Sequence, residues 1–268
     1  MAEKKKGGGI AETIKTVFWA LVLAGMIRTL LFQPFWIPSG SMKPTLLIGD
    51  FLFVNKFVYG YSWASCPTLF GFDFCWFAKG RDGRVWAGDP QRGDIIVFKH
   101  PETETDFIKR VVGLPGDRVQ MKNGTLFINN TPVEQSNPGT FVEIFGAQGP
   151  MGSFPRCSNS PVGIGGHCEK QSFDESLPGG ATHRTLNIGP GPGDNTGAFI
   201  VPEGHFFFVG DNRDNSTDSR FRKSVGGVGF VPASYLIGRA DRVIFSSAGR
   251  SILYFWSWRP DRYLKGLE

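Results

Sequence analysis

The order of apolar and polar positions along the chain predicts one helix followed by many short strands. Residues 13–32 are almost continuously apolar, with Lys15 and Arg28 near the two ends. About 20 such residues are needed to cross a bilayer as a helix. Further on, short apolar runs bounded by glycine and aspartate turns are typical of strands; they cover residues 51–54, 95–98, 206–209 and 236–245. We therefore expect a mainly β protein preceded by one N-terminal helix.

The N-terminal apolar stretch has three interpretations. A cleaved signal peptide would end in small residues, which are missing here. An interfacial helix would be apolar on one face, whereas this stretch is apolar all round. An uncleaved transmembrane anchor over residues 13–34 fits best. Lys4, Lys5 and Lys6 then place residues 1–12 in the cytoplasm and the remainder of the chain on the other side.

Composition adds little chemistry of its own. The net charge is +5, and the basic residues are scattered, so nucleic acid binding is not expected. The cysteines and histidines lack the spacing of a zinc site, and we expect no metal and no cofactor. The four histidines are expected to be solvated loop residues without a role; they are His100, His167, His183 and His205.

Candidate chemistry begins at the turn Ser39-Gly40-Ser41, which two prolines enclose. A serine hydroxyl is a weak nucleophile and needs a base. Neither a G-x-S-x-G elbow nor an S-x-x-K spacing occurs here, so the remaining base is Lys109. Its apolar neighbours can exclude water, which lowers the pKa of a lysine. The competing interpretation is an edge-strand lysine that reaches solvent.

Residues 210–220 form a dense polar loop directly after an apolar run. A solvated turn and a calcium loop are the simple explanations. The calcium loop fails, because Arg213 stands where an oxygen ligand is needed and the terminal glutamate is missing.

Four segments together closely resemble the bacterial type I signal peptidases (leader peptidases), and they occur in the same order as in that family. They are residues 37–46, 92–98, 107–117 and 210–220, and the resemblance runs from about Arg28 to Arg242. It implies a catalytic β-domain made of residues 35–118 and 205–250, with residues 119–204 inserted as a cap region. Residues 251–268 then form an aromatic and basic tail, which either packs on the body or touches lipid.

The resemblance also implies roles for individual residues. Ser41 corresponds to the nucleophile and Lys109 to the general base, while Ser39 joins the Ser41 amide in the oxyanion hole. Ser216 would orient the lysine amine, with Asp218 and Arg220 as a supporting pair. The substrate groove would be lined by Ile37, Pro38, Met42, Leu46, Val97, Phe107 and Ile108.

On this resemblance the protein is a membrane-anchored Ser/Lys endopeptidase. It would remove signal peptides from exported preproteins, cutting after small residues. Its partners would be signal peptides and the lipid bilayer. It would be located in the bacterial cytoplasmic membrane, with the catalytic domain on the extracytoplasmic side. The alternatives are a self-cleaving repressor-type protease, which would need a DNA-binding module, and a membrane-tethered β-domain that binds exported chains without cutting them.

The four cysteines form two pairs that each close a short loop. In an oxidising compartment such pairs predict disulfides. The resemblance favours a disulfide between Cys157 and Cys168, whereas a Cys66–Cys75 disulfide and two free thiols remain equal alternatives. The aromatic residues between Tyr59 and Asp89 predict either a packed hairpin or a skirt on the membrane interface.

Overall fold

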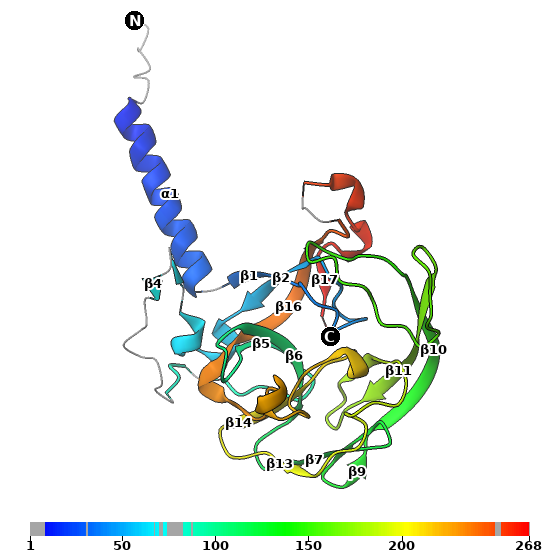
Figure 1. Cartoon of the computed structure of the whole chain (residues 1–268). Helices are drawn as coiled ribbons and strands as arrows, with labels where there is room; N and C mark the ends of the chain where they lie inside the picture. The colour runs from blue at the N-terminus through cyan, green and yellow to red at the C-terminus, as the bar shows by residue number, and fades with distance from the viewer. Residues whose placement is uncertain are drawn as a thin grey trace, which may run out of the picture.

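The computed structural model describes residues 9–30, 32–66, 68–69, 72–73, 83–86, 88–249 and 253–267. One long helix, α1 (Ile10–Leu30), projects from a body built of strands (Figure 1). The expectation of a mainly β protein is confirmed. The strands are β1 (Phe32–Trp36), β2 (Asp50–Asn55), β3 (Thr68–Leu69), β4 (Phe72–Asp73), β5 (Ile95–Lys99), β6 (Asp106–Gly113), β7 (Arg118–Lys122), β8 (Thr125–Ile128), β9 (Thr131–Pro132), β10 (Glu134–Ile144), β11 (His167–Ser176), β12 (Thr182–Asn187), β13 (Phe199–Ile200), β14 (His205–Val209), β15 (Val231–Pro232), β16 (Leu236–Ser246) and β17 (Lys265–Gly266).

Short 3-10 helices connect some of these strands. They are Phe57–Tyr59, Trp63–Ser65, Arg213–Asn215, Lys223–Val225, Ala233–Tyr235, Phe255–Ser257 and Pro260–Arg262.

The largest sheet has the order β1-β2-β16-β5-β6-β14-β15, with β17 added to β16. Its neighbours are antiparallel throughout. Both sides of this sheet carry apolar residues because both are covered. Phe206 and Phe208 of β14 enter one core cluster, whereas Phe207 and Val209 enter another. This alternation follows from the two-residue period of a strand, and it explains why β14 is apolar at successive positions.

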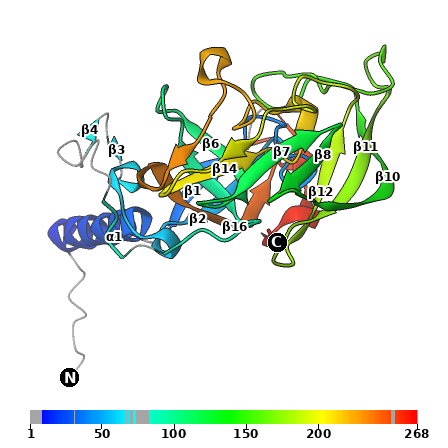
Figure 2. The same ribbon diagram turned by 90° about the horizontal axis from the view of Figure 1, so that it is seen from below.

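Two smaller sheets come from the segment between β6 and β14. One has the order β13-β7-β8-β9 and the other β10-β11-β12. Figure 2 shows the β10-β11-β12 sheet at the end of the molecule opposite α1. The chain returns to the large sheet at β14, so a continuous insertion separates the lysine strand β6 from the strand that leads into the polar loop.

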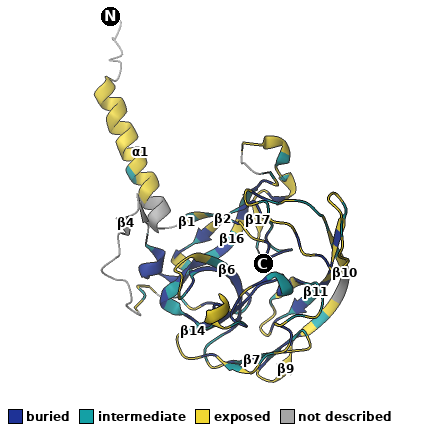
Figure 3. Cartoon of the chain, viewed as in Figure 1, coloured by how far each residue is buried: buried dark blue, intermediate teal, exposed yellow. Residues whose placement is uncertain are grey.

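The N-terminal helix differs from the expected span. It covers Ile10–Leu30 rather than residues 13–34, and β1 begins at Phe32. The chain leaves the helix here because Pro34 cannot continue one and because β1 pairs with β2. Apolar side chains of α1 such as Phe18 and Trp19 are exposed (Figure 3). Among the described residues, the structure contains no helix with the length and apolar character required to cross a bilayer.

One part of the C-terminal tail packs on the body, and another part is exposed. Arg262 is buried against Asp50 with 2.5 Å between Nη2 and Oδ2, and β17 extends the large sheet. Phe255 and Trp256, by contrast, are exposed. In the aromatic segment before β5, Trp63 is buried and packs edge-on against Tyr235. Residues 74–80 of that segment lie outside the described part of the chain.

Candidate active site

The turn that carries Ser41 is held by the core beneath it. The Ile37 amide donates to the Asp50 carbonyl at 2.9 Å, and the Leu46 amide donates to the Met42 carbonyl at 2.9 Å. Met42 and Leu46 are themselves fully buried. The burial of these apolar side chains therefore holds the short polar turn in place. Ser41 lies within this turn and is buried.

Lys109 lies directly beside this serine. Its Nζ is 2.6 Å from Oγ of Ser41 and 3.0 Å from the Ile108 carbonyl, although 68 positions separate the two residues in the chain. Strand β6 brings the amine there because it pairs with β5 through Lys109 and Ile96. The two residues expected to form the dyad are therefore within hydrogen-bond distance.

The surroundings of Lys109 favour its neutral form. The side chain is 4% exposed, and burial lowers the pKa of Lys109 to about 8, against an opposing effect of the Asp218 and Asp211 carboxylates. Loss of water penalises the charged ammonium more than the neutral amine. A lysine in this state can accept a proton near neutral pH.

The polar loop at residues 210–220 clamps the serine turn. The Asn212 side chain donates to the Gly40 carbonyl at 2.8 Å, and its backbone amide donates to the Ser41 carbonyl at 3.0 Å. Gly210 permits this approach, since a Cβ there would lie 2.2 Å from Oγ of Ser216 and 2.7 Å from the Ser41 carbonyl oxygen. Any side chain at this position would separate the loop from the turn.

Asp218 organises the rest of the loop. Its carboxylate accepts hydrogen bonds from Ser216 Oγ at 2.7 Å, from the Gly210 amide at 3.0 Å and from Arg220 Nε at 2.9 Å. Burial alone would raise the pKa of Asp218, but Arg220 and these hydrogen bonds hold it below its usual value. Ser216 thus donates to Asp218. The orientation of the Lys109 amine by Ser216 stays a prediction.

A buried ion pair links the base strand to the polar loop. Arg110 donates to both carboxylate oxygens of Asp211, at 2.9 and 2.8 Å, and Thr45 Oγ1 donates to Asp211 Oδ2 at 2.5 Å. No role was expected for these three residues or for Asn212. A signal was available, because an arginine inside the apolar strand 107–113 requires a buried acidic partner, but the sequence does not identify which acid that is.

The cap region contacts the polar loop through an ion pair and a backbone hydrogen bond. Glu175 of β11 lies 2.5 Å from Nη2 of Arg213, and the Leu186 amide of β12 donates to the Asp211 carbonyl at 2.8 Å. The expectation of solvated histidines is wrong here. His183 is buried between Glu175 and Asp211, and burial lowers its pKa to about 4.

His100 is buried as well, with Nδ1 accepting hydrogen bonds from the Glu102 and Thr103 amides. The polar loop is likewise no solvated turn, since Asp211, Asn212 and Asp218 have almost no exposed surface. The expectation for these two histidines and the alternative of a solvated turn both fail, because folding buries these groups.

The residues expected to line the substrate groove differ in exposure. Pro38 and Ser39 are exposed, whereas Phe107 and Ile108 are half-buried at the edge of the site. The Ser39 and Ser41 hydroxyl oxygens are 3.5 Å apart. The remaining groove residues belong to the core; they are Ile37, Met42, Leu46 and Val97.

The cap region contains one disulfide, between Cys157 and Cys168, with a Cα–Cα distance of 5.1 Å. It joins the segment before β11 to Cys168 of β11 itself. Cys75 lies outside the described residues, so the Cys66–Cys75 pair stays a prediction.

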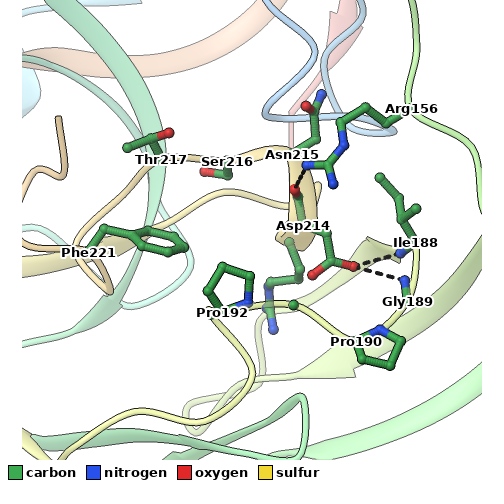
Figure 4. A pocket seen from close by; sticks show the side chains of 13 residues that line it. Arg156, Ile188, Gly189, Pro190, Pro192, Asp214, Asn215, Ser216, Thr217 and Phe221 are labelled. Carbon is green, nitrogen blue, oxygen red and sulfur yellow. Dashed lines mark hydrogen bonds between the residues drawn. The ribbon is translucent and has the colours of Figure 1, made fainter. Parts of the chain in front are cut away.

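A cavity of about 200 Å³ opens beside Ser41 on the side of the cap region. A second cavity, of about 450 Å³, lies beyond Asn215. Figure 4 shows the second cavity, where Arg156 donates to the Asp214 backbone carbonyl and the Asp214 carboxylate accepts from the Ile188 and Gly189 amides. Asn215 lines both cavities.

Comparison with known proteins places this chain in a family. The family model described as "Signal peptidase, peptidase S26" matches residues 10–245. Signal peptidase I of Rickettsia typhi is 38% identical over 248 residues, which cover 88% of this chain and 82% of the relative. Signal peptidase I of Rickettsia prowazekii is 37% identical with the same coverage. A crystal structure of a signal peptidase I from Enterococcus faecalis V583 aligns with a TM-score of 0.30 at 25% identity, covering 56% of this chain and 96% of that chain. The chain belongs to the signal peptidase family, peptidase S26.

Proposed function

We propose that the protein is a membrane-anchored serine endopeptidase that removes N-terminal signal peptides from exported preproteins, with Ser41 as nucleophile and Lys109 as general base. The observation that carries this proposal is the 2.6 Å separation between Lys109 Nζ and Ser41 Oγ in a buried setting. Family membership supports the reaction, and this geometry supports the choice of residues.

In the proposed reaction, Ser41 Oγ attacks the carbonyl carbon of the scissile peptide bond while Lys109 accepts the serine proton. The oxygen of that carbonyl becomes an oxyanion, which the Ser41 amide and the Ser39 hydroxyl stabilise; one such donor is typically worth about 10²–10³ in rate. The C–N bond then breaks, and Lys109 passes the proton to the departing amine. Water attacks the remaining ester with Lys109 again as the base, which frees Ser41.

Cleavage after small residues follows from the shape expected of the groove. The half-buried residues Phe107 and Ile108 form its wall, and core side chains close its floor. A shallow apolar pocket accepts a methyl group and rejects larger side chains. An extended substrate can align beside β6 as an added strand.

Membrane attachment through α1 is part of the proposal. The helix carries exposed apolar residues around its circumference, including Val17, Phe18 and Trp19, and such a surface favours a lipid environment. The Cys157–Cys168 disulfide supports a catalytic domain outside the cytoplasm, because disulfides persist in oxidising compartments.

The experiment is to incubate the detergent-solubilised full chain with a preprotein and to sequence the new N-terminus. We expect one cut after a small residue by the wild type and none by Ser41→Ala or Lys109→Ala, with all three proteins equally folded. A Ser41→Ala variant that still cuts would refute the assignment. A wild type that binds the preprotein without cutting it would identify a tethered binding domain instead.

A further inference from the structure

We propose that the cap region builds a binding subsite for the first residues of the mature chain, and that this subsite selects side chains bearing a carboxylate or carboxamide oxygen. The inference rests on the proposed function, since it assumes that Ser41 cuts a peptide. It concerns the cavity of about 200 Å³ beside Ser41.

The position of this cavity indicates which part of a substrate it receives. Ser39, Gly40 and Ser41 form one wall, while Gln148, Phe154 and Lys170 of the cap region form another. The groove proposed for the residues before the cut runs along β6 at Phe107 and Ile108, neither of which lines this cavity. An extended substrate passes the nucleophile with its two halves on opposite sides. The cap side therefore receives the residues after the cut.

The charge in this cavity is unbalanced. Lys43 Nζ lies 2.5 Å from Glu143 Oε2, and Lys170 contacts the other oxygen of the same carboxylate. Lys43 and Lys170 are buried, so two lysines share one acid in a place where solvent screens little. Burial lowers the pKa of Lys43, although Glu143 opposes this effect. The excess charge favours an anionic or strongly accepting group.

The hydrogen-bond inventory indicates the same ligand. Glu143 accepts from three donors, because Gln148 Nε2 also donates to it, at 2.7 Å. Lys43 donates to Glu143 and to Gln148 Oε1, and a lysine ammonium has three donors. Within the described residues, Lys170 donates to Glu143 alone. Lys170 therefore has donors left for a further acceptor, and an oxygen of a substrate side chain in this cavity would accept from them.

Lys43 also packs against the serine turn, so a substitution of Lys43 does not test the subsite alone. Its Cε lies 3.3 Å from the position of a Cβ added at Gly40, so the lysine stem packs under the serine turn. A substitution of Lys43 would disturb the nucleophile directly. Lys170 and Glu143 are the better probes, since Lys170 of β11 lines the cavity and Glu143 of β10 contacts both of its lysines.

The second cavity gives the mature chain a path away from the site. It shares Asn215 with the first cavity, and Arg156 lies on its wall (Figure 4). In the described part of the chain Arg156 donates to a backbone carbonyl and makes no ion pair. The Asp214 carboxylate lines the same cavity, so Arg156 gives this path no excess of positive charge.

The experiment uses peptide substrates that are identical up to the cut and carry Glu, Gln, Ala or Lys at each of the first three positions after it. For the wild type we expect the highest kcat/KM with Glu or Gln and the lowest with Lys at one or more of these positions. Lys170→Met should lower the Glu-to-Lys ratio of kcat/KM about tenfold, which corresponds to about 1.4 kcal/mol. Glu143→Gln should raise that ratio, because it removes the carboxylate that both lysines contact.

Lys122→Met is the matched control, since Lys122 is an exposed lysine at the end of β7. It should leave the ratio unchanged, and all variants should keep the same preference for small residues before the cut. Equal losses on every substrate, or an unchanged ratio in both cap variants, would overturn the subsite. If Lys170→Met does not fold, the subsite is tested by Glu143→Gln alone, for which the Glu-to-Lys ratio of kcat/KM should rise. A wild type that cuts none of the peptides would instead contradict the proposed function.

Discussion

The sharpest prediction concerns the pH dependence of cleavage. If Lys109 is the base, kcat/KM should rise tenfold per pH unit in acid and level off near pH 8. The reason is that the pKa of Lys109 is lowered to about 8 from its ordinary value of 10.5, chiefly by burial. Only the neutral amine can accept the Ser41 proton, so activity follows its deprotonation.

The magnitude follows from this shift. The fall from 10.5 to about 8 corresponds to about 3 kcal/mol of preference for the neutral amine. At pH 7 about one tenth of the enzyme would carry neutral Lys109, compared with about one molecule in 3,000 for an unperturbed lysine. Burial therefore raises the concentration of active base about 300-fold.

The assay is kcat/KM on one peptide substrate between pH 5 and pH 10, with circular dichroism at each pH to exclude unfolding. His183→Gln serves as the control, because His183 is the buried histidine nearest the polar loop and its pKa is lowered to about 4. The acid limb should keep its midpoint in this variant. Lys109→Arg should be inactive at every pH, since a guanidinium stays protonated.

Two results would refute the reasoning. A limb with its midpoint near 6.5 that disappears with a histidine substitution would assign the base to histidine. Substantial activity in Lys109→Arg would show that no neutral amine is needed.

Further predictions follow from the same contacts. Lys109→Met should raise the free energy of unfolding by up to about 3 kcal/mol at pH 7, and the gain should fade between pH 8 and 10.5, as denaturant titrations at several pH values would show. Glu175→Ala should lower stability by about 3–5 kcal/mol, because it leaves Arg213 buried without its partner; urea unfolding tests this, and a loss below about 1 kcal/mol would contradict it. Asn212→Ala should lower kcat about tenfold with little change in KM, since it releases the Gly40 carbonyl. Cys157→Ser should cost about 3 kcal/mol of stability while turnover at low temperature stays near normal. Protease added to intact spheroplasts should digest the body after about Phe35, and full protection would contradict the proposed topology.

Much of the chemistry was accessible from the sequence because it lies in short segments. The apolar runs predicted the strands, whereas the turn at Ser41 and the lysine in an apolar strand received the roles of nucleophile and base from the resemblance of four segments to a family. These are local properties, since strand periodicity and turn chemistry depend on neighbouring residues. The helix boundary was less accurate, because Phe32 joins β1 through a partner strand that begins at Asp50.

Only the tertiary structure decided which distant side chains meet. The clamp of Asn212 on Gly40, the Arg110–Asp211 pair and the burial of His183 each join segments far apart in sequence. The same holds for the contacts of Lys43 with Glu143, 100 positions away, and of Glu143 with Lys170. A residue's type and neighbours predict that a buried charge needs a partner, but they do not identify the partner. That choice is made when the cap region docks against the loop and the turn, and it depends on packing between elements that no local pattern records.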